Sequence, residues 1–258
     1  MTSAVLKISR LLLSWLYGDY LLDYLHLPKS TLAEKTITKN IFELAEISKA
    51  NKRMLTKDVN RITWEYRIAP DNSNIRAVCN DTIDYSEIQV IRIDLKQKVH
   101  ITRISDLILS SFQYPLLLVF CESSESLFVA AHVRINQNDK SRLVIEDVIR
   151  TDWIPNSQIP EETLDMSKMR STNLFDLYSD VYDALSKIKA ESHSNFSKVL
   201  TPDDYKTINT TVADFDEKIA ALRAQLKKED QFNRQVELNN RIKELQKSKE
   251  EFLQDFNE

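Results

Sequence analysis

The chain has 258 residues, with 35 basic and 39 acidic side chains and a formal net charge of −4 at pH 7. This balance excludes a global cationic field that would draw the protein to nucleic acid or to anionic lipid, so any such contact must be local. Gly18 is the single glycine, which excludes P-loops and Rossmann fingerprints because both need several glycines. The two cysteines are far apart and lack metal-ligand spacing, which favours a reducing cytoplasm.

The N-terminal stretch predicts helices. Residues 1–27 are apolar at helical spacing, but four charged side chains interrupt them, so we expect a packed amphipathic helix and not a membrane span. A second helix is predicted near 38–57 from the apolar spacing of "IFELAEISKANKRMLTKDV". Residues 1–57 therefore form an N-terminal helical segment in this interpretation.

The pattern changes to strands after this segment. In "RITWEYRI" (61–68), the alternation predicts a strand with its apolar side chains on one face and Arg61, Glu65 and Arg67 on the other. "EIQVIRIDL" (87–95) predicts a strand, "ITRISDLILSSF" (101–112) a helix, and "YPLLLVFCE" a strand buried on both faces. A strand, a crossover helix and a buried strand in this order favour a parallel pair with a right-handed connection.

Two more strands are expected in "SLFVAAHVRI" and "RLVIEDVIRTDWI". Residues 58–155 then form a mixed sheet of about five strands with flanking helices. The fold class is α+β.

The third segment, 156–258, is predicted to be helical and to end in a coiled-coil-like tail. Apolar residues from Ile208 to Leu226 step by three and four, and the register breaks around Glu229–Asp230. The tail is either one helix with a phase change or a helical hairpin. Its apolar stripe needs a partner, because a helix with one bare stripe is not stable alone. That partner is one of the chain's own helices, a second copy or another protein. The candidate partner-binding residues lie along this stripe; they are Leu222, Leu226, Phe232, Leu238, Ile242 and Leu245.

One group of polar residues lies on secondary-structure elements whose order along the chain is typical of a class of nucleases. The helix, strands and crossover helix from 38 to 121 resemble the core of restriction-endonuclease-like enzymes, in which two carboxylates hold a divalent cation and a lysine polarises the attacking water. Asp71 and Glu87 could supply the carboxylates and bind Mg²⁺. Gln89 stands where the lysine is expected. The alternative interpretation is a structural strand end that emerges into solvent.

No other cofactor or metal is expected, because the four histidines lie in separate segments without zinc-ligand spacing. The densest cationic zone outside the tail includes Lys35, Lys39, Lys52 and Arg53. These side chains are candidates for local phosphate contact, and the alternative is a solvated helix face.

The succession "KTITKNIFE", "WEYRIAPDNSNI", "EIQVIRIDL", "YPLLLVF", "RTDW" and "EDQFNRQVELNNRIKEL" resembles the prokaryotic family catalogued as domain of unknown function 4391. This resemblance assigns no reaction. It implies genes that often lie beside helicases and DNA methyltransferases, and hence a subunit of a DNA-processing or antiviral defence complex.

The leading hypothesis is a non-catalytic accessory or scaffolding subunit that binds a helicase-type partner, or a second copy, through its helical tail. The alternative is a variant metal-dependent nuclease that uses Asp71, Glu87 and Gln89.

Overall fold

The computed structural model describes residues 22–37, 47–139 and 143–257. Most of the helix expected over 1–27, the first part of the helix expected near 38–57, and Lys39 lie outside these ranges.

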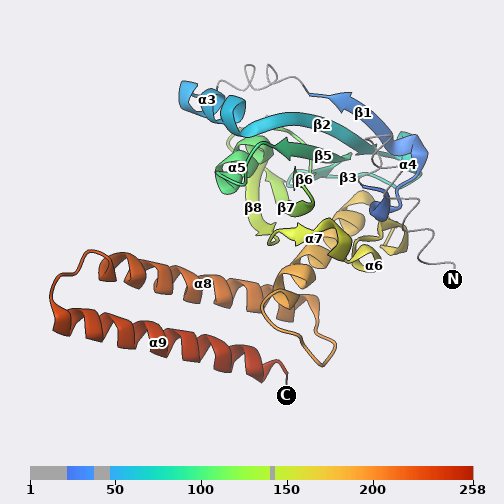
Figure 1. Ribbon diagram of the computed structural model, residues 1–258. Helices are drawn as coiled ribbons and strands as arrows, with labels where there is room; N and C mark the ends of the chain where they lie inside the picture. The colour runs from blue at the N-terminus through green and yellow to red at the C-terminus, as the bar shows by residue number, and fades with distance from the viewer. Residues whose placement is uncertain (1–21, 38–46, 140–142, 258) are drawn as a thin grey trace, which may run out of the picture. The chain divides into compact units, whose positions relative to one another are not determined.

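A mixed sheet forms the centre of the first half of the chain (Figure 1). The strands β5 and β6 run parallel, which confirms the predicted parallel pair, whereas β1–β2, β2–β5 and β6–β7 are antiparallel. In spatial order the strands are β1 (Leu32–Thr36), β2 (Val59–Ile68), β5 (Ile88–Leu95), β6 (Leu116–Glu122), β7 (Glu125–Ile135) and β8 (Leu143–Arg150), with β9 (Ile154–Pro155) beside β7.

The sheet contains more strands than the five expected from the sequence. The strand β1 has the sequence "LAEKT" and is mostly exposed, so it lacks the apolar alternation that would reveal it. The strands β3 (Val78–Cys79) and β4 (Asp84–Tyr85) form a separate two-stranded sheet.

The helices agree with the expected α+β class. After β2, the segment "APDNSN" forms the short helix α4. The described helices are α3 (Lys49–Asp58), α4 (Pro70–Ser73), α5 (Ile101–Ser111), α6 (Glu161–Leu164), α7 (Leu174–Glu191), α8 (Pro202–Leu226) and α9 (Phe232–Asp255). The short 3-10 turns are η1 (Asp23–Leu25), η2 (Lys29–Thr31), η3 (Asn156–Gln158) and η4 (Met166–Lys168). None of these described helices is long and apolar enough to cross a bilayer.

A β-bulge in β2 overturns the expected alternation of that strand. Trp64 is opposite Ile91, but Tyr66 is opposite Val90, so the register shifts by one residue at Glu65. A one-residue shift moves the following side chains to the other face of the sheet. The prediction that Glu65 and Arg67 share a face is therefore wrong.

One face of the sheet packs against α3 and α5. Side chains of β5, including Ile91 and Ile93, form a core with Leu55 of α3 and with Ile104 and Ile108 of α5. These five side chains are at most 2% exposed. Burying each of them contributes roughly 1.5–3 kcal/mol relative to exposure, so this layer holds the parallel pair in place.

The side chain of Tyr178, on α7, ties α7 to two strands. Its hydroxyl donates to the carbonyl of Leu116 at 2.7 Å and accepts the Ala131 N–H at 3.0 Å. The ring is fully buried, so this hydroxyl satisfies backbone groups at the N-terminal end of β6 and in the middle of β7 that would otherwise be costly to bury.

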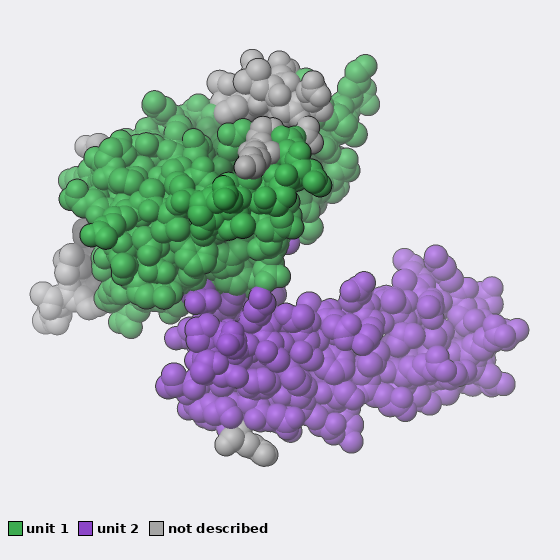
Figure 2. Space-filling model, turned by 180° about the vertical axis from the view of Figure 1, so that it is seen from behind, with its two compact units in different colours: residues 1–149, 153–182 green, residues 150–152, 183–258 purple. Residues whose placement is uncertain are grey.

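The chain divides into two compact units (Figure 2). The first, here called the sheet unit, contains residues 1–149 and 153–182, and the second, here called the hairpin unit, contains 150–152 and 183–258.

Inside the hairpin unit, α8 and α9 lie side by side as an antiparallel pair (Figure 1). The helix α8 begins at a capping box in which Thr201 and Asp204 exchange hydrogen bonds, with Pro202 at the first helical position. The core lies near this end; it contains Ala190, Leu200, Tyr205, Ile208, Val212 and Leu253.

Towards the loop that joins the helices, the buried residues of the two helices are reduced to Ile219 and Ile242. The tail is thus a hairpin of two helices, one of the two arrangements that the sequence left open.

Candidate functional site

The three residues of the candidate nuclease site lie together at one end of β2 and β5. The residue that connects them is Arg67, which sequence reasoning did not select. Its Nε donates to Glu87 Oε2 at 2.7 Å, and its Nη1 donates to both carboxylate oxygens of Asp71 at 3.0 Å. Gln89 is paired with Arg67 in the register of the two strands.

The short helix α4 brings Asp71 back to Arg67. The Asn72 side chain accepts the N–H of Ala69 at 2.9 Å and donates to the carbonyl of Arg67 at 2.8 Å. This closes the chain into a tight turn immediately after the strand. An acid four residues after an arginine, across a Pro-Asp-Asn turn, is the sequence signal that could have revealed the pair.

Burial differs strongly within this cluster. The side chain of Asp71 is 67% exposed and that of Glu87 only 11%. Gln89 is 4% exposed; its Nε2 donates to Glu87 Oε1, and its own Oε1 is buried without a hydrogen-bond partner among the described residues. Burying such an unpaired acceptor costs roughly 1–3 kcal/mol.

In this cluster one guanidinium, that of Arg67, forms ion pairs with two carboxylates, those of Asp71 and Glu87. Hydrogen bonds to Asp71 and Glu87 raise the pKa of Arg67 above its ordinary value, so the guanidinium stays charged and bridges the two carboxylates. Within the part of the chain that the structure describes, no three His, Cys, Asp or Glu side chains gather as metal ligands. Binding of a divalent cation between Asp71 and Glu87 would require Arg67 to move away.

A second charged cluster, which the sequence also did not reveal, includes Glu65 at the bulge in β2. The Arg92 guanidinium forms ion pairs with Glu65 at 3.1 Å and with Asp94 at 3.0 Å, and the Arg92 and Glu65 side chains are 6% and 9% exposed. Nearby, burial raises the pKa of the Cys121 thiol to about 12. A thiol with this pKa is not a nucleophile at neutral pH, so we assign this cluster a structural role.

A third feature is the pair formed by Asp58 and His100. The Asp58 carboxylate is fully buried, accepts Gln97 Nε2 at 2.6 Å and lies 2.8 Å from His100 Nδ1. Burial acts to raise the pKa of Asp58, but the hydrogen bonds from His100 and Gln97 outweigh it, so the pKa is lowered. His100 has a positive φ of 56° just before α5. The pair thus holds the turn from β5 to α5.

The candidate phosphate contacts lie on separate elements. Lys35 is exposed on the edge strand β1, and Lys52 and Arg53 are exposed on α3. Their role in phosphate contact stays a prediction.

The exposed large apolar side chains of the two helices lie at the loop end of the α8–α9 hairpin. Phe232 and Val236, one helical turn apart on α9, are 74% and 42% exposed. Phe232 is among the predicted partner-binding residues, whereas Val236 is not. Of the others, Ile242 is buried between the two helices, and Leu222, Leu226, Leu238 and Leu245 are half-buried.

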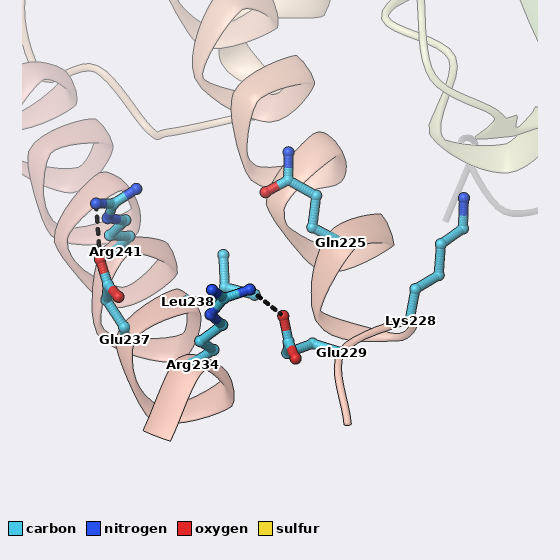
Figure 3. Close-up of a pocket in the computed structure, with 7 residues that line it drawn as sticks. All are labelled: Gln225, Lys228, Glu229, Arg234, Glu237, Leu238 and Arg241. Carbon is cyan, nitrogen blue, oxygen red and sulfur yellow. Dashed lines mark hydrogen bonds and ion pairs between the residues drawn. The ribbon is translucent and has the colours of Figure 1, made fainter. Parts of the chain in front are cut away.

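A hollow of about 370 Å³ lies at this same end of the hairpin (Figure 3). Arg234 pairs with Glu229 at 3.9 Å and Arg241 with Glu237 at 2.8 Å. The hollow is lined by Gln225, Lys228, Glu229, Arg234, Glu237, Leu238 and Arg241. Its walls are therefore charged around one leucine, which is typical of a surface for a polar or amphipathic ligand and not for an apolar small molecule.

Comparison with known proteins identifies a family but no reaction. The sequence model of the family described as Domain of unknown function (DUF4391) matches residues 25–248. No curated protein and no solved structure matches the chain.

Proposed function

The chain belongs to the DUF4391 family, and on this premise we propose that it is a non-catalytic accessory or scaffolding subunit that binds another protein through the α8–α9 hairpin. The class of partner follows from the family resemblance alone, which implies a helicase-type subunit of a DNA-processing or antiviral defence complex.

The observation that carries this proposal is the exposed pair Phe232 and Val236. A phenyl ring that is 74% exposed in the first turn of a helix costs free energy in water that burial in an interface would recover. Phenylalanine is among the residues enriched at the centres of interfaces.

The state of the Arg67 cluster supports the non-catalytic part of the proposal. The two carboxylates that a nuclease would offer to a cation already accept hydrogen bonds from one guanidinium at 2.7–3.0 Å. A catalytic carboxylate must be free to bind the metal.

Purification of the full chain from cells that encode it tests the proposal. We expect a helicase-type subunit to co-purify in stoichiometric amount with the natural protein and to be lost with the double variant Phe232→Ser/Val236→Ser. The control is Val199→Ser, because Val199 is 99% exposed in the same unit but lies before α8. An unchanged partner with the double variant, or no stoichiometric partner at all, overturns the proposal.

A second candidate function is the variant nuclease, favoured by one observation. Asp71 and Glu87 both contact Arg67, Gln89 contacts Glu87, and the buried Gln89 Oε1 has no hydrogen-bond partner among the described residues. This function predicts cleavage of plasmid DNA with Mg²⁺ or Mn²⁺ that Glu87→Ala abolishes without lowering the melting temperature.

The matched control for the nuclease assay is Glu146→Ala, which removes an exposed carboxylate paired with Arg134. Cleavage that survives Glu87→Ala, or no cleavage by the natural protein with either cation, rejects the nuclease function.

A further inference from the structure

The charges of the hairpin are divided between its two ends. Residues 218–243, which include the loop and both adjoining helix ends, hold seven basic and three acidic side chains. Residues 202–217 together with 244–257, at the opposite end, hold three basic and nine acidic side chains. The first set is here called the tip and the second the base.

The internal structure of the hairpin does not account for this division. The two helices are antiparallel, so like charges of α8 and α9 lie at the same end and repel one another. The helix dipole accounts for α8, which has Asp203 and Asp204 in its first turn and Arg223 in its last. It does not account for α9, whose first turn contains Arg234 and no acid and whose last turn contains no base.

Several cations of the tip lack a side-chain partner within the described residues, and two of them are adjacent in the sequence. The side chains of Lys227 and Lys228 form no hydrogen bond or ion pair there, although Arg234 and Arg241 both pair with glutamates. In Figure 3, Lys228 extends from the end of α8 away from these two ion pairs. Phe232 follows four residues later, so free cations and an exposed ring occur within one short segment.

From these observations we infer that the occupant of the tip is an acidic segment of another protein that also carries a large apolar side chain. Its carboxylates would neutralise Lys227 and Lys228, and its apolar side chain would cover Phe232 and Val236. The inference rests on the proposed function, because it names the chemistry of the partner that the hairpin binds.

Nucleic acid fits the tip less well than such a peptide. Glu229 and Glu237 line the hollow and would repel phosphates there. A peptide segment, in contrast, offers backbone amides to these glutamates and an aliphatic or aromatic side chain to Val236. Tip-to-tip packing of two copies is also disfavoured, because two tips carry the same excess of positive charge.

Cross-linking from the tip provides the test. The full chain is produced in its own cells with the substitution Phe232→p-benzoylphenylalanine, irradiated and purified, and the attached molecule is identified by mass spectrometry. The matched control places the same photoreactive side chain at Gln246, at the base end of α9. We expect position 232 to label a protein segment with a clear excess of Asp and Glu and at least one large apolar residue.

The result of the cross-linking experiment distinguishes failure of the inference from failure of the proposed function. Labelling of a neutral or basic segment of another protein overturns the inference and leaves the proposed function standing. Labelling of nucleic acid or of a second copy, or no labelling above that at Gln246, overturns both.

A peptide with the sequence of the labelled segment then serves as the probe for binding to the full chain. We expect Lys227→Glu/Lys228→Glu to weaken binding by at least about tenfold, and added salt to weaken binding to the natural protein. The control Lys247→Glu reverses a charge at the base and should leave affinity within about twofold. Equal affinity of the natural protein and the double variant would overturn the inference.

Discussion

The sheet unit and the hairpin unit bury their side chains to very different extents. In the sheet unit, residues such as Phe120, Phe128 and Val119 have no exposed surface. In the 49 residues of α8 and α9 the buried side chains are Tyr205, Ile208, Val212, Ile219, Ile242 and Leu253. A sheet covered by helices encloses whole side chains, whereas two helices in contact cover only one stripe of each. Among the described residues, the hairpin unit holds three of the four exposed large apolar side chains, which are Val199, Phe232 and Val236, whereas the sheet unit holds Leu32.

The strongest test of this comparison replaces one phenylalanine in each unit. Phe120→Ala removes a fully buried ring of β6, and we expect it to lower the free energy of unfolding by about 3–5 kcal/mol. Phe232→Ala removes an exposed ring, and we expect a change within about 0.5 kcal/mol. Urea denaturation followed by circular dichroism measures both. Similar losses for the two variants would show that Phe232 is buried in the isolated protein.

The second-largest expected effect is the loss in free energy of unfolding when a buried ion pair is broken, compared with the loss when an exposed one is broken. Arg92→Leu leaves Glu65 buried without its cation, and we expect a loss of about 3 kcal/mol. Arg241→Ala breaks a pair whose two side chains are about 60% exposed, and we expect a loss below about 0.5 kcal/mol. The same denaturation experiment compares them. A negligible loss for Arg92→Leu would mean that water reaches Glu65 in solution.

An effect of intermediate size is the pH dependence of stability that arises from Asp58. The pKa of Asp58 is lower in the folded protein than its ordinary value of 3.8, so its ionised form stabilises the fold. This stabilisation is complete above about pH 5 and is lost as the pH falls through the folded pKa, below 3.8. We expect Asp58→Asn to lower stability by about 1–3 kcal/mol at pH 7.

The pH profile itself is the measurement for Asp58. Stability of the natural protein and of Asp58→Asn should converge as the pH falls from 5 towards 3. Parallel profiles over this range would show that the Asp58 carboxylate does not gain stability from its hydrogen bonds. Asp106→Asn, at an exposed position of α5, is the control.

The smallest expected effect is local to the hairpin. Thr201→Ala removes the side chain that caps α8, and we expect a loss of about 1 kcal/mol. Hydrogen exchange should become faster in the first turn of α8 and stay unchanged in β5 and β6. Faster exchange in those strands as well would show that the two units unfold together.

Much of the fold of the described chain follows from local pattern. The continuous apolar run of β6 and the helical spacing of α5 identified a parallel pair, because burial on both faces and helix periodicity leave distinct signals. The edge strand β1 left no such signal, since only one of its sides pairs with the sheet and most of its side chains are polar. The bulge at Glu65 left none either, because a one-residue insertion is visible only when the partner strand is known.

The candidate site shows the same limit. Sequence reasoning selected Asp71, Glu87 and Gln89, and the structure brings them together, but it also places Arg67 between the carboxylates. Arg67 was unremarkable in the sequence, because a strand arginine is usually solvated. Its pairing with Glu87 depends on the register of β2 and β5.

The sequence by itself determined the α+β class, the parallel pair and the helical tail, because hydrophobic periodicity and helix-breaking positions are local properties of the chain. Only the tertiary structure decided that the tail doubles back into a hairpin and that Arg67 bridges the two carboxylates of the candidate site. Both depend on contacts between segments far apart in the sequence, and such contacts are set by packing and strand register.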